Sequence, residues 1–349
     1  MVKLLKFPSL VQEKIVKMMI FMEIFELSHT SKRARNMLKS LRIQAEQLYY
    51  EFNKGTYEIW LNFYGETDYG RTIVDKFGMI VKDSRKRKNV EHQVKIESLN
   101  RTLTAIGSHE QLLPFEFFEK QTNHILSFFK VKETNVLYRH GKKFGLQNFF
   151  FWKNSQRYQK VQMQAWSDQK LTLSKCQLAF LLEEVDTKEM ILEVGLEPKH
   201  TYQYPKQESS KIEKLQILNS SWVCFEELLA MDNKEVICVA QYSQNFRTAN
   251  VLLKSWIQGN NVKLEEFQYT KFAVSKLAQS DRDAIFFGTN ATPTLFTYEQ
   301  LVTRGIYDLN SGAMDIRREK DGMLATVKLG LDNMRVVIWH QKHLKAIGQ

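Results

Sequence analysis

The first forty residues constrain this chain more than any other stretch, because they hold three short apolar patterns with helical spacing. The segment begins with Phe7-Pro8. Proline disfavours the α region for the residue before it and suits the first turn of a helix, so we expect an extended residue followed by a helix. Three short helices in about 40 residues bury too little surface to be stable alone. This segment is therefore expected to bury apolar surface on a partner.

The apolar spacing predicts where these helices lie. The first stripe consists of Val11, Ile15, Met18 and Met19. A break around Ile20-Phe21 precedes a second apolar turn that ends at Leu27-Ser28. The third helix is amphipathic, with Ala34, Met37, Leu38 and Leu41 on one face. Three residues are candidate N-caps for it, namely Ser28, Thr30 and Ser31.

This ordered combination resembles an F-box, the docking module of SCF-type ubiquitin ligases. The resemblance is carried by Phe7-Pro8, the spaced apolar helix, Glu23-Ile24, Leu27-Ser28 and Ser31-Lys32-Arg33. It implies that the segment binds a Skp-type adaptor and, through it, a cullin. The residues that match motif positions packing inside the module or against the adaptor are Phe7, Pro8, Leu10, Ile15, Met18, Met19, Ile24, Leu27 and Ser28. The alternative is an N-terminal helical cap on a larger domain.

Residues 47–160 are the least informative part of the sequence. Strand-like segments occur at Tyr57–Phe63, Ile73–Val81 and Val94–Leu99, and a helix is expected over Pro114–Phe129. We treat this stretch as an unassigned α/β segment that begins a repeat-like domain.

From Val161 onward, strand and helix patterns alternate. The expected strands are Val161–Ala165, Glu189–Val194, Lys214–Leu218, Glu235–Ala240 and Lys263–Tyr269, and the expected helices are Leu173–Glu184, Trp222–Met231 and Phe246–Gln258. Successive strands begin roughly 25 residues apart, as in leucine-rich repeats. Such units leave one apolar face open and close their core by stacking on their neighbours. An ordinary α/β domain is the alternative.

The same region resembles the F-box-associated region, type 2, of the large nematode F-box families. The matching residues are Trp222, Leu228, Asn250, Leu253, Trp256, Ile257, Gly259 and Leu264. Further on, Asp321-Gly322 lies between two alternating runs, which is a strong hairpin signal. The resemblance implies that this region holds an unknown protein target. We expect Trp256 to be a core residue, because it lies beside Leu252, Leu253 and Ile257 on one helix.

The sequence therefore predicts an α+β chain with three parts. These are a small three-helix F-box (1–46), the unassigned segment (47–160), and an irregular leucine-rich-repeat-like α/β domain (161–345) that ends in a β-hairpin. No nucleotide-binding, zinc-protease or nucleophile-elbow motif is present, and the eight histidines and three cysteines show no ligand spacing. We expect a non-catalytic subunit without metal or cofactor.

Two further functions remain as alternatives, and the first of them concerns charge. The net charge is +11, and residues 1–46 and 71–101 carry most of it. A basic nucleic-acid-binding or chromatin-associated protein would need both segments on one face. We do not expect nucleic acid as a partner, and Arg85-Lys86-Arg87-Lys88 is read as an exposed loop rather than a nuclear localisation patch. The second alternative is an F-box scaffold that does not lead to degradation.

The sequence also bears on localisation. The N-terminal apolar stretch is interrupted by charges, and no apolar run approaches the ~20 residues of a membrane span. We expect no membrane partner and a cytoplasmic location, with the nucleus as the alternative.

Overall fold

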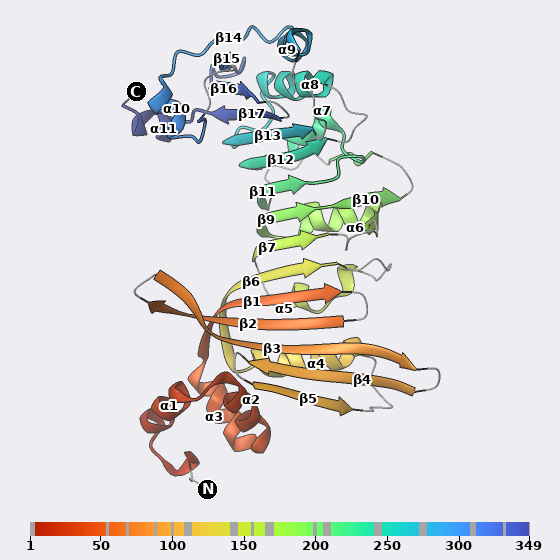
Figure 1. The fold of residues 1–349 in the computed structure, drawn as a ribbon, viewed down its shortest axis with the longest axis vertical. Coiled ribbons are helices and arrows are strands. Elements are labelled where there is room, and N and C mark those ends of the chain that lie inside the picture. The colour runs from red at the N-terminus through yellow and green to blue at the C-terminus, as the bar shows by residue number, and fades with distance from the viewer. Residues whose placement is uncertain are drawn as a thin grey trace. The chain divides into compact units, whose positions relative to one another are not determined.

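The computed structural model describes most of the chain (Figure 1). The described residues are 4–53, 56–67, 70–86, 89–98, 101–107, 114–139, 146–154, 157–164, 171–197, 201–204, 211–240, 246–271, 278–307, 312–330 and 333–348. They form two compact units, one of residues 1–142 and 149–161 and one of residues 143–148 and 162–349. Both units combine helices with sheet, so the predicted α+β class is confirmed. The predicted boundaries near residues 46 and 160 stay a prediction.

Three helices occupy the N-terminus, as predicted. They are α1 (Ser9–Met18), α2 (Phe21–Thr30) and α3 (Lys32–Leu41). Pro8 precedes α1 in an extended conformation, with φ −54° and ψ 150°. The backbone N–H of Ile20 donates to the Glu23 carboxylate at 3.1 Å where α2 begins. Of the three candidate N-caps of α3, Ser31 has this role, because its hydroxyl accepts a hydrogen bond from the Ala34 backbone N–H at 3.1 Å.

A mixed sheet follows the helices in the first unit. Its strands are β1 (Ile43–Asn53), β2 (Thr56–Thr67), β3 (Gly70–Lys86), β4 (Asn89–Ser98), β5 (Arg101–Gly107), β6 (Phe129–Tyr138) and β7 (Tyr158–Met163), the last contributing residues up to Val161. The spatial order is β7-β6-β1-β2-β3-β4-β5. Strands β1 to β5 pair with their sequence neighbours in antiparallel fashion. The chain then returns through α4 (Pro114–Leu126), and β6 pairs in parallel with β1 (Figure 1).

The prediction for residues 47–160 is incomplete. The three predicted strands correspond to β2, β3 and β4, although β2 and β3 are longer than predicted and Leu99 lies outside the described residues. Strands β1, β5 and β6 were not predicted from the sequence. The helix predicted to reach Phe129 ends at Leu126, because Phe129 pairs with Ile43 and begins β6. Tertiary pairing thus overrides the local helical pattern.

An aromatic cluster forms the core beneath β1. Between ring centroids, Phe52 lies 5.0 Å from Phe151, 5.2 Å from Phe149 and 6.0 Å from Phe118 of α4. These rings come from β1, from α4 and from the segment at α5 (Phe151–Asn154). Offset and edge-on aromatic pairs at such distances add to the stabilisation that burial alone provides.

The second unit contains the predicted alternation of strands and helices. Its strands are β8 (Leu171–Ser174), β9 (Thr187–Leu192), β10 (Val194–Glu197), β11 (Ile212–Ile217), β12 (Glu235–Ala240), β13 (Glu266–Lys271), β14 (Thr292–Pro293), β15 (Met314–Arg317), β16 (Leu324–Leu329) and β17 (Asn333–Ile338). Its helices are α6 (Lys175–Ala179), α7 (Phe225–Leu228), α8 (Phe246–Ile257), α9 (Gln279–Phe286), α10 (Tyr298–Val302) and α11 (Gln341–Ala346). Strands β9, β11, β12 and β13 are parallel neighbours, and α7 and α8 connect the last three (Figure 1).

Buried asparagines join successive strand–helix units. The Asn233 side chain donates to the Ile212 carbonyl at 2.7 Å, and the Asn261 side chain donates to the Asn233 carbonyl at 2.8 Å. Each asparagine precedes a parallel strand, β12 or β13, and satisfies a backbone oxygen one unit earlier in the chain. Buried polar groups need such partners, so these amides fix the stacking of the units.

The predicted C-terminal hairpin is present between β15 and β16. Gly322 adopts φ +69°, and the Arg318 backbone N–H donates to the Met323 carbonyl at 2.9 Å across the turn. Glycine enters this left-handed region at little cost. The chain continues beyond the hairpin into β17, which pairs with β16 and with β13, and then into α11.

We predict that Asn233→Ala lowers the free energy of unfolding of the second unit by about 1–3 kcal/mol, because the buried hydrogen bond from the Asn233 amide to the Ile212 carbonyl is lost. Urea unfolding of the full chain measures the change. Gln258→Ala, which removes an exposed amide at the end of α8, is the control. Equal effects of the two substitutions would contradict a stacking role for Asn233.

Candidate protein-docking surfaces

Helix α1 leaves most of its apolar side chains exposed. Within α1 only Val16 is buried. Met18 is 85% exposed and Leu10 is 62% exposed, and Phe7, Pro8 and Val11 are exposed beside them. We call Phe7, Pro8, Leu10, Val11 and Met18 the α1 surface. Single exposed apolar residues are ordinary, but five of them on and just before one short helix are typical of an interaction site.

Helix α2, in contrast, packs its aromatic side chains on the sheet of the same unit, with Phe25 buried and Phe21 half-buried. The Phe21 ring stacks on Phe63 of β2 with an interplanar angle of 11°. The Phe25 ring lies 5.3 Å from Phe77 of β3, and Phe21 lies 5.7 Å from Phe129 of β6. These contacts orient the three helices so that α1 stays uncovered.

A polar cluster fixes α2 against α4. The Ser28 hydroxyl donates to the Phe25 carbonyl at 2.5 Å, and it lies 2.9 Å from Nε2 of His124 on α4. The Ser28 hydroxyl also lies 3.0 Å from Nδ1 of His29. With its single proton on the Phe25 carbonyl, this hydroxyl can accept a hydrogen bond from Nε2 of His124. The His29 ring lies 4.6 Å from the His124 ring and 4.6 Å from the Phe25 ring.

The environment of this cluster favours neutral His124. The pKa of His124 is lowered from 6.5 to about 4, first by burial of the ring and then by the positive charges of His29, Arg35 and Lys39. A neutral ring with hydrogen on Nε2 agrees with the donor role toward Ser28. The interface between α2 and α4 is therefore most stable when the His124 imidazole is uncharged.

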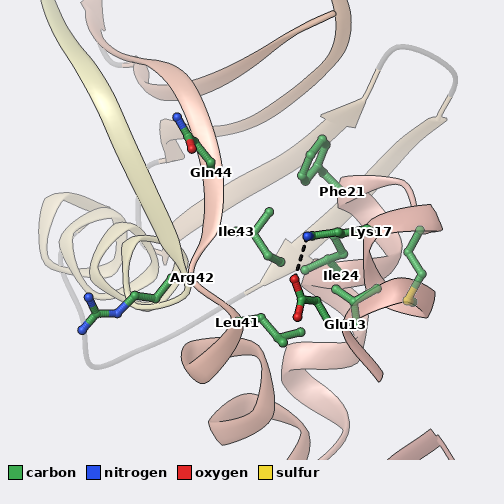
Figure 2. Close-up of a pocket in the computed structure, with 10 residues that line it drawn as sticks. Glu13, Lys17, Phe21, Ile24, Leu41, Arg42, Ile43 and Gln44 are labelled. Carbon is green, nitrogen blue, oxygen red and sulfur yellow. Dashed lines mark ion pairs between the residues drawn. The ribbon is translucent and has the colours of Figure 1, made fainter. Parts of the chain in front are cut away.

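A cavity of about 410 Å³ opens between α1, α2 and the junction of α3 with β1 (Figure 2). Its lining is mainly apolar, with Val16, Met19, Phe21, Ile24, Leu41 and Ile43 among the residues that form it. Lys17 and Glu13, which also line it, form an ion pair at 2.6 Å (Figure 2). Arg42 and Gln44 complete the polar part of the lining, and the larger apolar part is suited to an apolar side chain of a protein partner.

The predicted F-box residues fall into three groups. Phe7, Pro8, Leu10 and Met18 are exposed, Ile15, Met19 and Leu27 are half-buried, and Ile24 and Ser28 are buried. The exposed group forms the α1 surface, while Met19 and Ile24 line the cavity. Val11 was not predicted as a docking residue. Val11 lies next to the predicted residue Leu10 on α1, where only Val16 is buried. This adjacency to Leu10 is the feature that would have indicated Val11 as a docking residue.

The predicted residues of the associated region pack inside the second unit and hold its segments in place, rather than facing a partner. Leu228, Leu253, Trp256, Ile257 and Leu264 are buried, Trp256 as its helical neighbours predict. The Trp222 indole donates to the Val194 carbonyl at 2.9 Å. The Asn250 amide donates to the carbonyls of Ile285 (2.7 Å) and Phe287 (2.9 Å). Gly259 adopts φ +105° just after the end of α8, a left-handed conformation that glycine takes at little cost and that commonly terminates helices.

The basic residues lie on α3 and at the end of β3. Lys32, Arg33, Lys39 and Arg42 are exposed on or just after α3. Arg85 and Lys86 end β3, while Arg87 and Lys88 of the predicted basic loop lie outside the described residues. Within the described part of the chain, no three His, Cys, Asp or Glu side chains are placed to hold a metal ion. None of the helices in that part combines the length and apolarity needed to cross a membrane.

Comparison with protein families agrees with this arrangement. A family model described as the F-box domain matches residues 4–45, which include all three N-terminal helices and the start of β1. A second family model, described as F-box associated, matches residues 204–269, from the segment before β11 into β13. No curated protein and no solved structure matches the chain. Both sequence resemblances, to an F-box and to an F-box-associated region, are confirmed.

The low pKa of His124 predicts a pH-dependent stability. The unfolded chain takes up a proton at His124 near pH 6.5, whereas the folded chain does so only near pH 4. The stabilisation is therefore complete above pH 6.5 and is lost as the pH falls from 6.5 toward 4. We expect His124→Gln, which keeps a donor for Ser28, to lose less stability than the unaltered chain between these values.

Urea midpoints of both chains at about pH 7 and about pH 5 measure this difference. Other titrating groups contribute equally to the two chains and cancel in the comparison. Parallel pH profiles of the two chains would contradict the assignment to His124.

Proposed function

Because the chain carries an F-box followed by an F-box-associated region, we propose that it is the target-recruiting subunit of an SCF-type ubiquitin ligase. The F-box would bind a Skp-type adaptor and, through it, a cullin, and the second unit would bind a protein target. Such a subunit performs no chemistry itself. Holding the target near the conjugating enzyme raises its effective concentration there.

The observation that carries this proposal is the contrast between α1 and α2. Helix α2 packs Phe21 and Phe25 against the sheet, while α1 presents Leu10 and Met18 to solvent. A helix that served only as a cap would turn its apolar side toward the protein. The exposed α1 surface is instead available to a partner, and desolvated apolar anchors of this kind dominate binding at protein interfaces.

The cavity in Figure 2 adds a second element to the docking site. Its lining includes Met19 and Ile24, two residues at F-box motif positions, and it begins where α1 ends. We propose that the adaptor covers the α1 surface and inserts an apolar side chain into this cavity. The half-buried side chains of Ile15 and Leu27 complete the packing behind it.

We predict that Leu10→Asp combined with Met18→Asp weakens adaptor binding by at least about 30-fold, because each charge faces an apolar partner and a central anchor contributes about 2 kcal/mol or more. Isothermal titration calorimetry of the full chain with purified Skp-type adaptor measures the affinity. Both side chains are exposed, so the thermal midpoint should stay unchanged.

Point substitutions test this site better than deletion of residues 1–45, which would uncover Phe63 and Phe77 of the sheet. Val262→Asp places the same charge on an exposed apolar residue of the second unit and is the matched control. Full adaptor affinity of the double variant would refute the α1 surface as the docking site. Absence of binding by the unaltered chain would refute the proposed function.

A further inference from the structure

We infer that the target binds as a peptide segment that places a large apolar side chain in a cavity between residues 288–295 and the β15–β16 hairpin, with a carboxylate close beside it. This inference rests on the proposed function, because it names the position and the chemistry of the target site. The cavity lies in the second unit and mainly beyond residues 204–269, the part that matches the associated family.

The cavity has a volume of about 350 Å³. One wall is formed by the segment from Gly288 to Leu295, which connects α9 to β14 and continues just past β14. The opposite wall is formed by the hairpin, with Arg317 and Glu319. This volume is at the lower end of the range for ligand sites and suits one or two side chains rather than a cofactor.

The residues typical of the associated region hold both walls in place. Asn250 binds the Ile285 and Phe287 carbonyls and so fixes the end of α9. Ile257 lines the cavity, and its carbonyl accepts a hydrogen bond from the Glu319 backbone N–H at 2.8 Å. Trp256 lies beneath the buried guanidinium of Arg318, 5.5 Å from the ring centroid. A buried scaffold therefore positions two segments that are themselves exposed.

Large apolar side chains are exposed at this rim. Leu295, which lines the cavity, is 91% exposed, and Phe287, next to the lining residue Gly288, is 75% exposed. Exposed aromatic and aliphatic residues at the edge of a cavity are the usual anchors of peptide binding.

Two cations flank the cavity, and neither forms an ion pair with a carboxylate in the part of the chain that the structure describes. The exposed Arg317 side chain forms its hydrogen bond with the Gly322 carbonyl, at 3.4 Å, and no ion pair joins it to an acid within the described residues. The Lys254 ammonium lies 5.2 Å from the Phe287 ring centroid. It also lies next to Gly288, where an added Cβ would be 3.3 Å from Nζ. A carboxylate on the target would neutralise these charges.

The acidic residues near the cavity define the orientation of the peptide. Asp315 is already occupied, because its carboxylate accepts hydrogen bonds from the Thr326 hydroxyl (2.6 Å) and the Leu295 backbone N–H (3.3 Å). Asp321 is paired with Arg318, which holds the pKa of this carboxyl at about 2. Glu319 is exposed and free to repel a second carboxylate. The acid of the target is thus directed toward Arg317 and Lys254.

The test is selection of a randomised library of short peptides on the immobilised full chain. Enriched peptides should share a large apolar residue with Asp or Glu close to it. Leu295→Asp should lower their enrichment at least about tenfold, the effect of losing roughly 1.4 kcal/mol of binding free energy. Arg317→Glu should change the preferred neighbour from Asp or Glu to Lys or Arg. Val262→Asp, outside the cavity, should leave the selection unchanged.

Three results would overturn the inference: no enrichment, enriched peptides without the apolar–acidic pattern, or the same peptides on both cavity variants. Adaptor affinity, measured on the same protein preparations, separates this inference from the proposed function. If the unaltered chain and the variants all bind adaptor while the peptides fail, the cavity assignment alone is wrong. If peptides bind through the cavity but adaptor does not bind, the ligase role is wrong.

Discussion

The first unit depends on the burial of one helix, α2, on a sheet that follows it in sequence. Phe21 and Phe25 of α2 pack on Phe63, Phe77 and Phe129. Three short helices cannot close a core by themselves, and these aromatic contacts provide the missing surface. The side of α1 that carries Leu10, Val11 and Met18 is then left exposed by the described part of the chain. The α1 surface is thus exposed because α2 is packed against the sheet, and not because of the sequence of α1 alone.

The second unit is held together by side chains that donate hydrogen bonds to backbone carbonyls far away in the sequence. Trp222, Asn233, Asn250 and Asn261 each donate to a carbonyl in another segment. Such buried donors are needed because irregular connections leave carbonyls that no strand or helix pairs. They fix the positions of loops, while the residues at the loop surfaces remain free to differ. The same set of buried residues can therefore hold loops whose exposed residues differ.

Much of this architecture follows from local sequence patterns, and the exceptions have a physical cause. The N-terminal helices, the parallel strands from β9 onward and the Asp-Gly hairpin were predicted because each has a local signal in period or turn chemistry. Strands β1 and β6 were missed because they are held by pairing between distant residues, such as Ile43 with Phe129. The cavity near Leu295 was missed because it joins α8, the α9–β14 connection and the hairpin. No single window of sequence contains it.

The short junction between α3 and β1 has a thermodynamic consequence. Only Arg42, in the left-handed conformation with φ 44°, separates the helix from the strand, so no flexible linker uncouples the two. A partner that binds folded α1 and not the unfolded chain adds its binding free energy to the stability of the unit, about 2.7 kcal/mol at a hundred times Kd. Because α2 shares a core with β2 and β3, that gain extends to strands that touch no partner. The partner-bound protein would then unfold less often than the free protein and persist longer in the cell.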